Sequence, residues 1–194
     1  MTGKNNCLQR AKFTTLRHAT PEDLAIVQKA DAALFDELPG RIYKHLQLLE
    51  FVPNGHPITQ LEHSLQAATR AHQDGRDEDY VVCALLHDVG DIICPHDHAA
   101  FAAMLLKPFV HESLCWMIEK HAIFQKYYYF DTLGRDPNQR DKYRESPYFD
   151  MTVEFCERYD QCSFDPDFSS LPLESFYPML ERVFQNKYKE HGLK

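Results

Sequence analysis

Ala84-Leu85-Leu86-His87-Asp88-Val89-Gly90-Asp91 is the stretch from which the fold is predicted. It places adjacent histidine and aspartate side chains at the end of an apolar run that begins at Val81. A buried carboxylate is costly unless a cation or hydrogen bonds satisfy it, and one metal ion satisfies both side chains together. Because adjacent helical residues point about 100° apart, His87 and Asp88 can coordinate one ion from two directions. The second carboxylate oxygen of Asp88 is then free to reach another ion.

Length and composition are those of a soluble protein with one domain. The chain has 194 residues, 44% of them hydrophobic and 26% charged. Its net charge of −8 argues against a nucleic-acid partner, because proteins bind phosphate backbones with clustered Lys and Arg side chains. The apolar runs are too short for a membrane span, and residues 1–10 contain no apolar signal core. We therefore expect a cytoplasmic protein without a membrane partner, and nothing in the sequence indicates a protein partner.

The six cysteines are scattered and form no Cys-x-x-Cys pair. Disulfides are typical of secreted chains, and we expect these thiols to be reduced and not to bind metal. They are Cys7, Cys83, Cys94, Cys115, Cys156 and Cys162.

Apolar residues recur at helical spacing along the chain, and no stretch alternates convincingly with period two. The pattern predicts an all-α bundle in one domain, residues 1–194, with its metal-binding core at about 59–160 and helices 20–51 and 172–184 packed on it. Pro39-Gly40 is expected to separate the first two helices, and residues 134–147 to form a charged surface excursion. The expected helices cover residues 20–38, 41–51, 59–73, 77–89, 97–106, 111–130, 147–160 and 172–184.

Histidines on different helices are the second sign of a metal site, since bundles build such sites from inward-facing side chains. Surface, loop or cap positions are the better interpretation for His18, His45, His56, His72, His111 and His191. Apolar residues flank the remaining four candidates, and Asp160 closes a late helix. His96 competes with His98, which is preferred because it begins an Ala-rich helix. The four candidates are His63, His87, His98 and His121.

At this point the sequence resembles a known family. His63, the pair His87-Asp88, and Asp160 resemble the signature of the HD-domain superfamily of metal-dependent enzymes. His98 and His121 resemble the pair of histidines that adds a second metal ion. Their order, with Gln60-Leu61-Glu62-His63-Ser64-Leu65-Gln66 around the first histidine, is similar to that of the mixed-valence diiron oxygenases. These include myo-inositol oxygenase and the oxygenases that cleave the C–P bond of 1-hydroxyphosphonates. Residues 116–129 and 172–174 further resemble a branch that acts on a trimethylammonium-bearing hydroxyphosphonate.

The resemblance implies an HD-domain bundle with two iron ions, Fe(II) and Fe(III), and O₂ as cosubstrate. Asp88 would bridge the ions and is the implied catalytic residue. The implied reaction converts a small organophosphonate, (1R)-1-hydroxy-2-(trimethylamino)ethylphosphonate, to glycine betaine and phosphate. A nitrogen and oxygen ligand set without thiolate also suits Fe or Mn better than structural zinc. By the resemblance, iron 1 is bound by His63, His87, Asp88 and Asp160, and iron 2 by Asp88, His98 and His121.

A dinuclear phosphohydrolase or phosphodiesterase is the alternative, because such HD-domain enzymes share these ligands. In many of them a Lys follows the His-Asp-x-Gly segment, where it can meet a phosphate. Here Asp91 holds that position, and its carboxylate would repel a phosphodiester. A surface loop residue is the other interpretation of Asp91. A degenerate HD domain that only binds ligands is disfavoured, because all six ligand types are present.

Substrate contacts are expected on the helix that carries His121. Phe124, Gln125 and Tyr128 follow it at i+3, i+4 and i+7 and should share its face, although aromatic residues on a core helix often simply pack. Aromatic walls attract quaternary ammonium groups, and Asp91 would add to that attraction. The phosphonate relatives place a Lys where Gln125 stands, which leaves the anion contacts open. The candidates for those contacts are Lys126 and Arg158.

Overall fold

The fold is taken from a computed structural model that describes residues 9–186, so Cys7 and His191 lie outside the described residues. Within that range every regular element is helical and no strand occurs, which confirms the predicted all-α class. No helix in that range is both long and apolar enough to cross a membrane. The α-helices are α1 Pro21–Asp36, α2 Leu38–Leu48, α3 Gln60–Gln73, α4 Glu78–Leu86, α5 His98–Leu106, α6 Glu112–Gln125, α7 Phe149–Phe155 and α8 Tyr177–Glu181.

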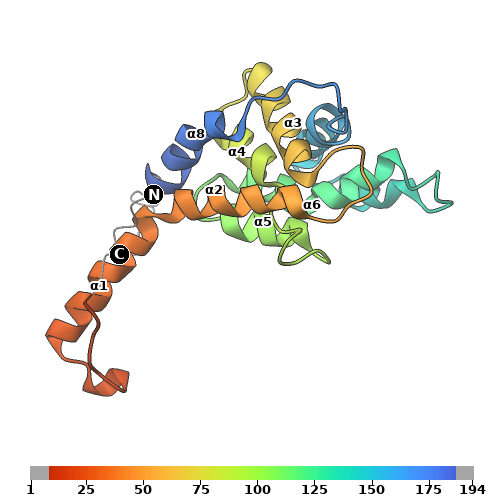
Figure 1. Cartoon of the computed structure of the whole chain (residues 1–194). Helices are drawn as coiled ribbons and strands as arrows, with labels where there is room; N and C mark the ends of the chain where they lie inside the picture. The colour runs from red at the N-terminus through yellow and green to blue at the C-terminus, as the bar shows by residue number, and fades with distance from the viewer. Residues whose placement is uncertain (1–8, 187–194) are drawn as a thin grey trace.

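The body of the molecule is a bundle in which helices distant in sequence lie side by side (Figure 1). α3 packs on α4, and α6 packs on both α5 and α7. The C-terminal helices cover α2 and α4. α4 is enclosed on all sides, and the stretch from Val81 to Leu86 is fully buried. Its end therefore lies in the centre of the bundle, as expected for a helix that delivers His87 and Asp88.

α1 projects away from this body (Figure 1). Its start follows the predicted signals, because Thr20 and Asp23 form a capping box and Pro21 occupies the first turn. Asp23 is its only buried residue, whereas α2 packs against α8. Of the two N-terminal helices expected on the core, only the second lies there.

Several boundaries differ from those expected, each for a local reason. Pro39-Gly40 does not separate two helices but lies in the first turn of α2, where the missing proline N–H needs no partner. α4 ends at Leu86, and residues 87–93 continue in successive tight turns. The seventh helix is α-helical to Phe155 and then widens into a π-helix, Cys156–Asp160. The last is divided into 3-10, α and π segments, Leu173–Phe176, α8 and Arg182–Asn186.

The described cysteines agree with their expected state. Of the five described cysteines, Cys94, Cys115, Cys156 and Cys162 have free thiols. Cys83 and Cys156 are fully buried, where a thiol packs as a small apolar group. None of the five belongs to the cluster of side chains described next.

Candidate metal centre

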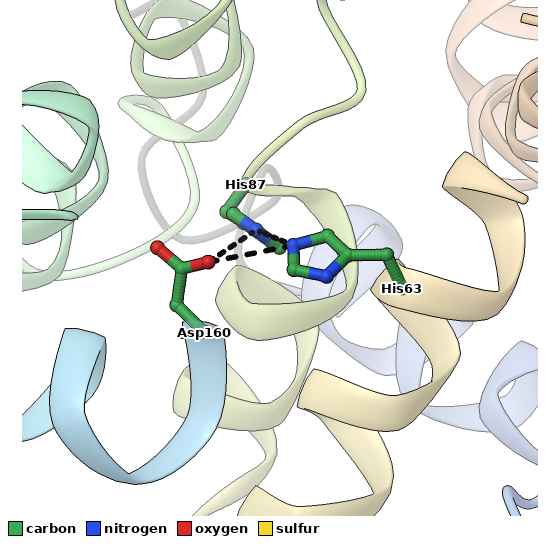
Figure 2. A group of neighbouring side chains, drawn as sticks. All are labelled: His63, His87 and Asp160. Atoms are coloured by element: carbon green, nitrogen blue, oxygen red, sulfur yellow. Dashed lines mark hydrogen bonds and ion pairs between the residues drawn. The ribbon is translucent and has the colours of Figure 1, made fainter. Parts of the chain in front are cut away.

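Three of the predicted ligands converge in the centre of the bundle (Figure 2). His63 extends from α3, His87 follows the end of α4, and Asp160 lies on the π-helix. The Nε2 atoms of His63 and His87 are 3.0 Å apart. Oδ1 of Asp160 lies 3.4 Å from Nε2 of His63 and 3.8 Å from Nε2 of His87. All three side chains are at most 1% exposed, so this group is closed to bulk water.

Asp88 joins this group to a second one through its two oxygens. Its Oδ2 lies 3.3 Å from Nε2 of His87 and 3.5 Å from Nε2 of His63. Its Oδ1 lies 3.2 Å from Nε2 of both His98 and His121. One carboxylate thus faces two pairs of histidines with different oxygens. That arrangement can hold two cations side by side with Asp88 between them.

The tautomers of three histidines follow from their outer hydrogen bonds. Nδ1 of His63 bonds the Ser163 carbonyl at 2.8 Å, and Nδ1 of His87 bonds the Ala84 carbonyl at 2.8 Å. Nδ1 of His121 bonds the Ile118 carbonyl at 2.6 Å. A carbonyl only accepts, so each Nδ1 carries a proton. Each Nε2 is then the atom that can bind a metal, and the outer bond fixes the plane of its ring.

The polar atoms of the centre fit a metal ion. Oδ2 of Asp160 is buried and has no hydrogen-bond partner among the described residues. Burial disfavours charge on His87, but the carboxylates of Asp88 and Asp160 and the Ala84 carbonyl together outweigh burial and raise the pKa of His87 to about 9. The Nε2 lone pairs otherwise face each other and the two carboxylates, so the centre favours a positive charge at this point. A metal cation would supply that charge and a partner for the orphaned oxygen.

The π-helix explains how Asp160 reaches this point. Gln161 N–H bonds the Cys156 carbonyl at 2.9 Å, which adds one residue to the last turn. The following turn is held by a hydrogen bond from the Ser163 hydroxyl to the Tyr159 carbonyl. On the far side, Nε of Arg76 donates to the Tyr159 hydroxyl at 2.8 Å. The same short segment therefore supplies Asp160 and the Ser163 carbonyl that orients His63.

Two glutamines bind the carboxylates, and the sequence analysis had left Gln60 unassigned and placed Gln125 only among the substrate contacts. Nε2 of Gln60 donates to Oδ2 of Asp88 at 2.7 Å, and Nε2 of Gln125 donates to Oδ1 of Asp160 at 2.6 Å. Gln60 is one helical turn before His63 and Gln125 one turn after His121. The i, i+3 and i, i+4 spacing was therefore the signal that could have revealed this role.

A cavity of about 540 Å³ opens directly onto the centre. Asp88 and His98 form its floor, and no lysine or arginine of the described residues lines it. Phe164, another residue not predicted, stacks on the His63 ring with ring centroids 4.4 Å apart. His56, which was set aside as a loop residue, lies beside Phe164 in the wall. The lining residues are His56, Pro57, Gln60, Asp88, Asp91, His98, Gln125, Tyr128, Tyr129, Gln161 and Phe164.

Half of the predicted substrate contacts line this cavity, and half do not. Asp91, Gln125 and Tyr128 are in its wall. Phe124 is fully buried and packs between Trp116, Tyr143 and Phe149 instead. It turns to the opposite side of His121 from Gln125, because i+3 and i+4 positions flank the i position on a helix.

The two predicted anion contacts also lie outside the cavity wall. Arg158 is half-exposed and pairs with Asp74 at 2.7 Å and with Glu154 at 3.2 Å. Lys126 has its Nζ 5.3 Å from the ring centroid of Phe130. Surface ion pairs account for Arg158 and packing against an aromatic ring accounts for Lys126, and neither side chain lines the cavity.

His98, rather than His96, is the histidine that the structure brings to Asp88. His96 is exposed in the preceding loop. Nδ1 of His98 lies 3.1 Å from Oδ1 of Asp91, while its Nε2 faces Asp88. Asp91 therefore holds the outer nitrogen of His98, as the backbone carbonyls hold those of the other three histidines. This contact was not expected for Asp91, which the sequence analysis interpreted as a neighbour of the substrate or as a surface loop residue.

The family of this architecture is given by comparison with known proteins. Residues 61–150 match the model of the HD domain, and this range contains every proposed ligand except Asp160. The chain contains an HD domain. In addition, a 36-residue segment of the chain is 56% identical to the [1-hydroxy-2-(trimethylamino)ethyl]phosphonate dioxygenase (glycine-betaine-forming) of Leisingera caerulea. That segment covers 19% of this chain and 18% of the Leisingera protein.

Proposed function

We propose that the protein is an O₂-dependent oxygenase with two iron ions that cleaves the C–P bond of a 1-hydroxyphosphonate. The proposed substrate is (1R)-1-hydroxy-2-(trimethylamino)ethylphosphonate, and the products are glycine betaine and phosphate. His63, His87, Asp88 and Asp160 would hold one ion, and Asp88, His98 and His121 the other. The observation that carries the proposal is the division of Asp88 between two pairs of histidines.

The two halves of the centre differ in exposure and in the number of protein ligands, as expected for an oxygenase that binds its substrate at one ion. The half with His63, His87 and Asp160 is closed and rich in ligands. The half with His98 and His121 has fewer protein ligands, and His98 lies at the cavity. An ion in the second half would keep positions for a small molecule, while the first ion would be shielded from it. This asymmetry supports substrate binding at one ion of the pair.

The cavity favours a substrate with a cationic end. Tyr129 and Phe164 provide aromatic surface, and Asp91 provides a carboxylate. Aromatic faces attract quaternary ammonium groups by about 1–2 kcal/mol when both are desolvated. The short match to a dioxygenase whose name specifies a trimethylamino group is consistent with this chemistry.

The protein side chains would hold the metal ions, orient the substrate and exclude bulk water. Gln60 and Gln125 fix the carboxylates of Asp88 and Asp160. The aromatic wall would separate the reacting carbon from bulk water. When bound, two iron ions would supply the redox chemistry and the coordination positions for O₂ and the hydroxyphosphonate. The overall reaction balances without another reductant, since a 1-hydroxyphosphonic acid and O₂ together contain the atoms of one carboxylic acid and one phosphoric acid.

Activity under controlled O₂ separates this proposal from a phosphohydrolase. Protein purified anaerobically and loaded with Fe(II) should consume one O₂ for each phosphate and each glycine betaine formed. The 2-amino analogue, which lacks the three methyl groups, should react with a KM about 5- to 30-fold higher because it loses cation–π contact. An oxygen electrode, a phosphate assay and mass spectrometry of the organic product give these values.

The control is the same protein loaded with Mn(II) or Zn(II) and offered a cyclic dinucleotide without O₂. Phosphate or nucleotide release under those conditions would assign the protein to the hydrolytic branch and overturn the oxygenase. A mixed-valence electron paramagnetic resonance signal that changes on adding the hydroxyphosphonate would support two coupled irons.

Asp91→Asn tests the contact between Asp91 and His98. The amide keeps the size of the side chain but removes the charge that accepts the Nδ1–H of His98. We expect one metal ion to bind about 10- to 100-fold more weakly, with the other unaffected. Metal titration against a competing chelator measures both affinities. Asp97→Asn is the matched control, because Asp97 is exposed on the same loop and makes no capping bond. Equal affinities in wild type and Asp91→Asn would remove Asp91 from this role.

A further inference from the structure

Arg140 is a half-buried cation whose guanidinium group is only partly hydrogen-bonded. It lies on the 3-10 segment Pro137–Tyr143, within the charged excursion after α6. Its Nε and Nη1 are buried and have no hydrogen-bond partner among the described residues. No carboxylate of residues 9–186 forms an ion pair with it. Buried guanidinium N–H groups without acceptors are costly, so their retention needs a reason.

The guanidinium lies directly behind the cavity wall. Its carbon is 3.5 Å from the ring centroid of Tyr127, whose ring meets that of Tyr128 at 5.4 Å. Tyr128 is a wall residue of the cavity. Burial raises the pKa of Tyr128 to about 12, and the neighbouring Arg140 acts against that rise. Arg140 therefore lies beside the hydroxyl of a residue that faces the ligand.

The neighbour of Arg140 shares a cavity with the metal centre, because Tyr128 lines it together with Asp88 and His98. A guanidinium behind the wall of a cavity whose other lining groups suit metal cations is disfavoured by like charge. An anion bound between the Arg140 guanidinium and the metal centre would attract both and so replace this repulsion with attraction.

We propose that Arg140 is a positioning residue for an anionic ligand and acts through Tyr128. The guanidinium donates to the Tyr128 oxygen, so the hydroxyl proton of Tyr128 is turned toward an anionic oxygen in the cavity. The chemical class of this ligand is a phosphate or phosphonate monoester-like dianion, an identity that rests on the proposed function. Arg140 would thus supply the positive charge that Lys126 and Arg158 do not bring to the cavity.

The arrangement assigns the two ends of the ligand to different walls. Asp91 and the metal ligand His98 are joined at 3.1 Å on one side, and Tyr128 belongs to the segment after α6. A cationic group would avoid the wall that Arg140 supports. An anionic group would lie between Tyr128 and the metal centre. A zwitterionic ligand therefore has one preferred orientation in the cavity.

Binding of unreactive anions tests the inference without relying on turnover. The probes are inorganic phosphate and 2-(trimethylamino)ethylphosphonate, which lacks the 1-hydroxyl group, each titrated calorimetrically into metal-loaded protein under anaerobic conditions. Arg140→Gln should weaken both by roughly 10- to 100-fold, since it removes a hydrogen bond that carries charge. Arg140→Lys should recover part of the loss. Arg144→Gln is the matched control, because Arg144 is exposed and pairs with Asp141 at 3.1 Å.

Tyr128→Phe distinguishes positioning from a general structural effect. If Arg140 acts through the hydroxyl, Tyr128→Phe should weaken phosphate binding, and Arg140→Gln should add little in the double variant. Metal content should stay at the wild-type value in all variants. Unchanged phosphate affinity in Arg140→Gln, or fully additive losses in the double variant, would overturn the inference. Should Arg140→Gln not fold, Arg140→Lys and Tyr128→Phe decide it by the same comparison.

The proposed function and the anion site can each fail while the other holds. Phosphate binding that depends on Arg140 in a protein without oxygenase activity would retain the anion site and reject the oxygenase. Oxygenase activity with a KM that is unchanged in Arg140→Gln would retain the oxygenase and reject the anion site.

Discussion

Asp88→Asn should reduce the metal content from two ions per chain to at most one and abolish turnover. The two oxygens of Asp88 face different histidine pairs, at 3.3 and 3.5 Å on one side and 3.2 Å on the other. An amide has one oxygen only, so it presents N–H groups to one pair of nitrogens that need a cation. The loss of charge also weakens the remaining ion, which we expect to bind at least about 100-fold more weakly.

Metal analysis after equilibrium dialysis measures this effect, with circular dichroism to confirm the helical fold. Asp150→Asn is the matched control, because Asp150 is exposed on α7. Two firmly bound ions in Asp88→Asn would contradict the bridging role. One ion with wild-type affinity would mean instead that Asp88 serves a single ion, and that the His98 and His121 nitrogens have another purpose.

The order of the helices and the candidate ligands could be predicted because each depends on local sequence. Apolar spacing identified the helices, and His63, His98 and His121 each stood on one of them with apolar neighbours. The structure brings these three together with His87, Asp88 and Asp160. Which oxygen of Asp88 faces which histidine depends on the packing of four helices, and periodicity contains no information about that.

The errors have a common cause in tertiary packing. Phe124 and Gln125 are equally close to the His121 face by helical geometry, but only Gln125 reaches a carboxylate. The π-turn before Asp160 adds a residue that 3.6-residue periodicity cannot anticipate. Asp91 does line the cavity, but charge alone did not reveal its contact with His98. In each case the deciding contact lies outside the regular i to i+4 spacing of an α-helix or depends on packing between helices.

Gly90 connects the predicted motif to the geometry of the second half of the centre. A Cβ atom on Gly90 would lie 2.7 Å from both the Cα and the carbonyl oxygen of His98. Those are backbone atoms, so they cannot move aside as a side-chain tip would. The turn after Asp88 or the start of α5 must shift, and either movement separates His98 from Asp88 and Asp91. Glycine is therefore required here for close approach.

Gly90→Ala should consequently lose one metal ion and keep the other. The three atoms nearest to the added Cβ all belong to His98 and none to the first group, His63, His87 and Asp160, which should hold its ion. We expect a loss of stability of about 1–3 kcal/mol from overpacking, measured by urea unfolding of the metal-free protein. Gly55→Ala is the matched control, since its Cβ would meet nothing within 4 Å. Substoichiometric oxygen consumption with one ion retained would show that the second ion, and not metal binding as such, is required for turnover. Gly90→Ala protein with two ions and full activity would show that His98 is not a ligand, because its backbone cannot remain in place.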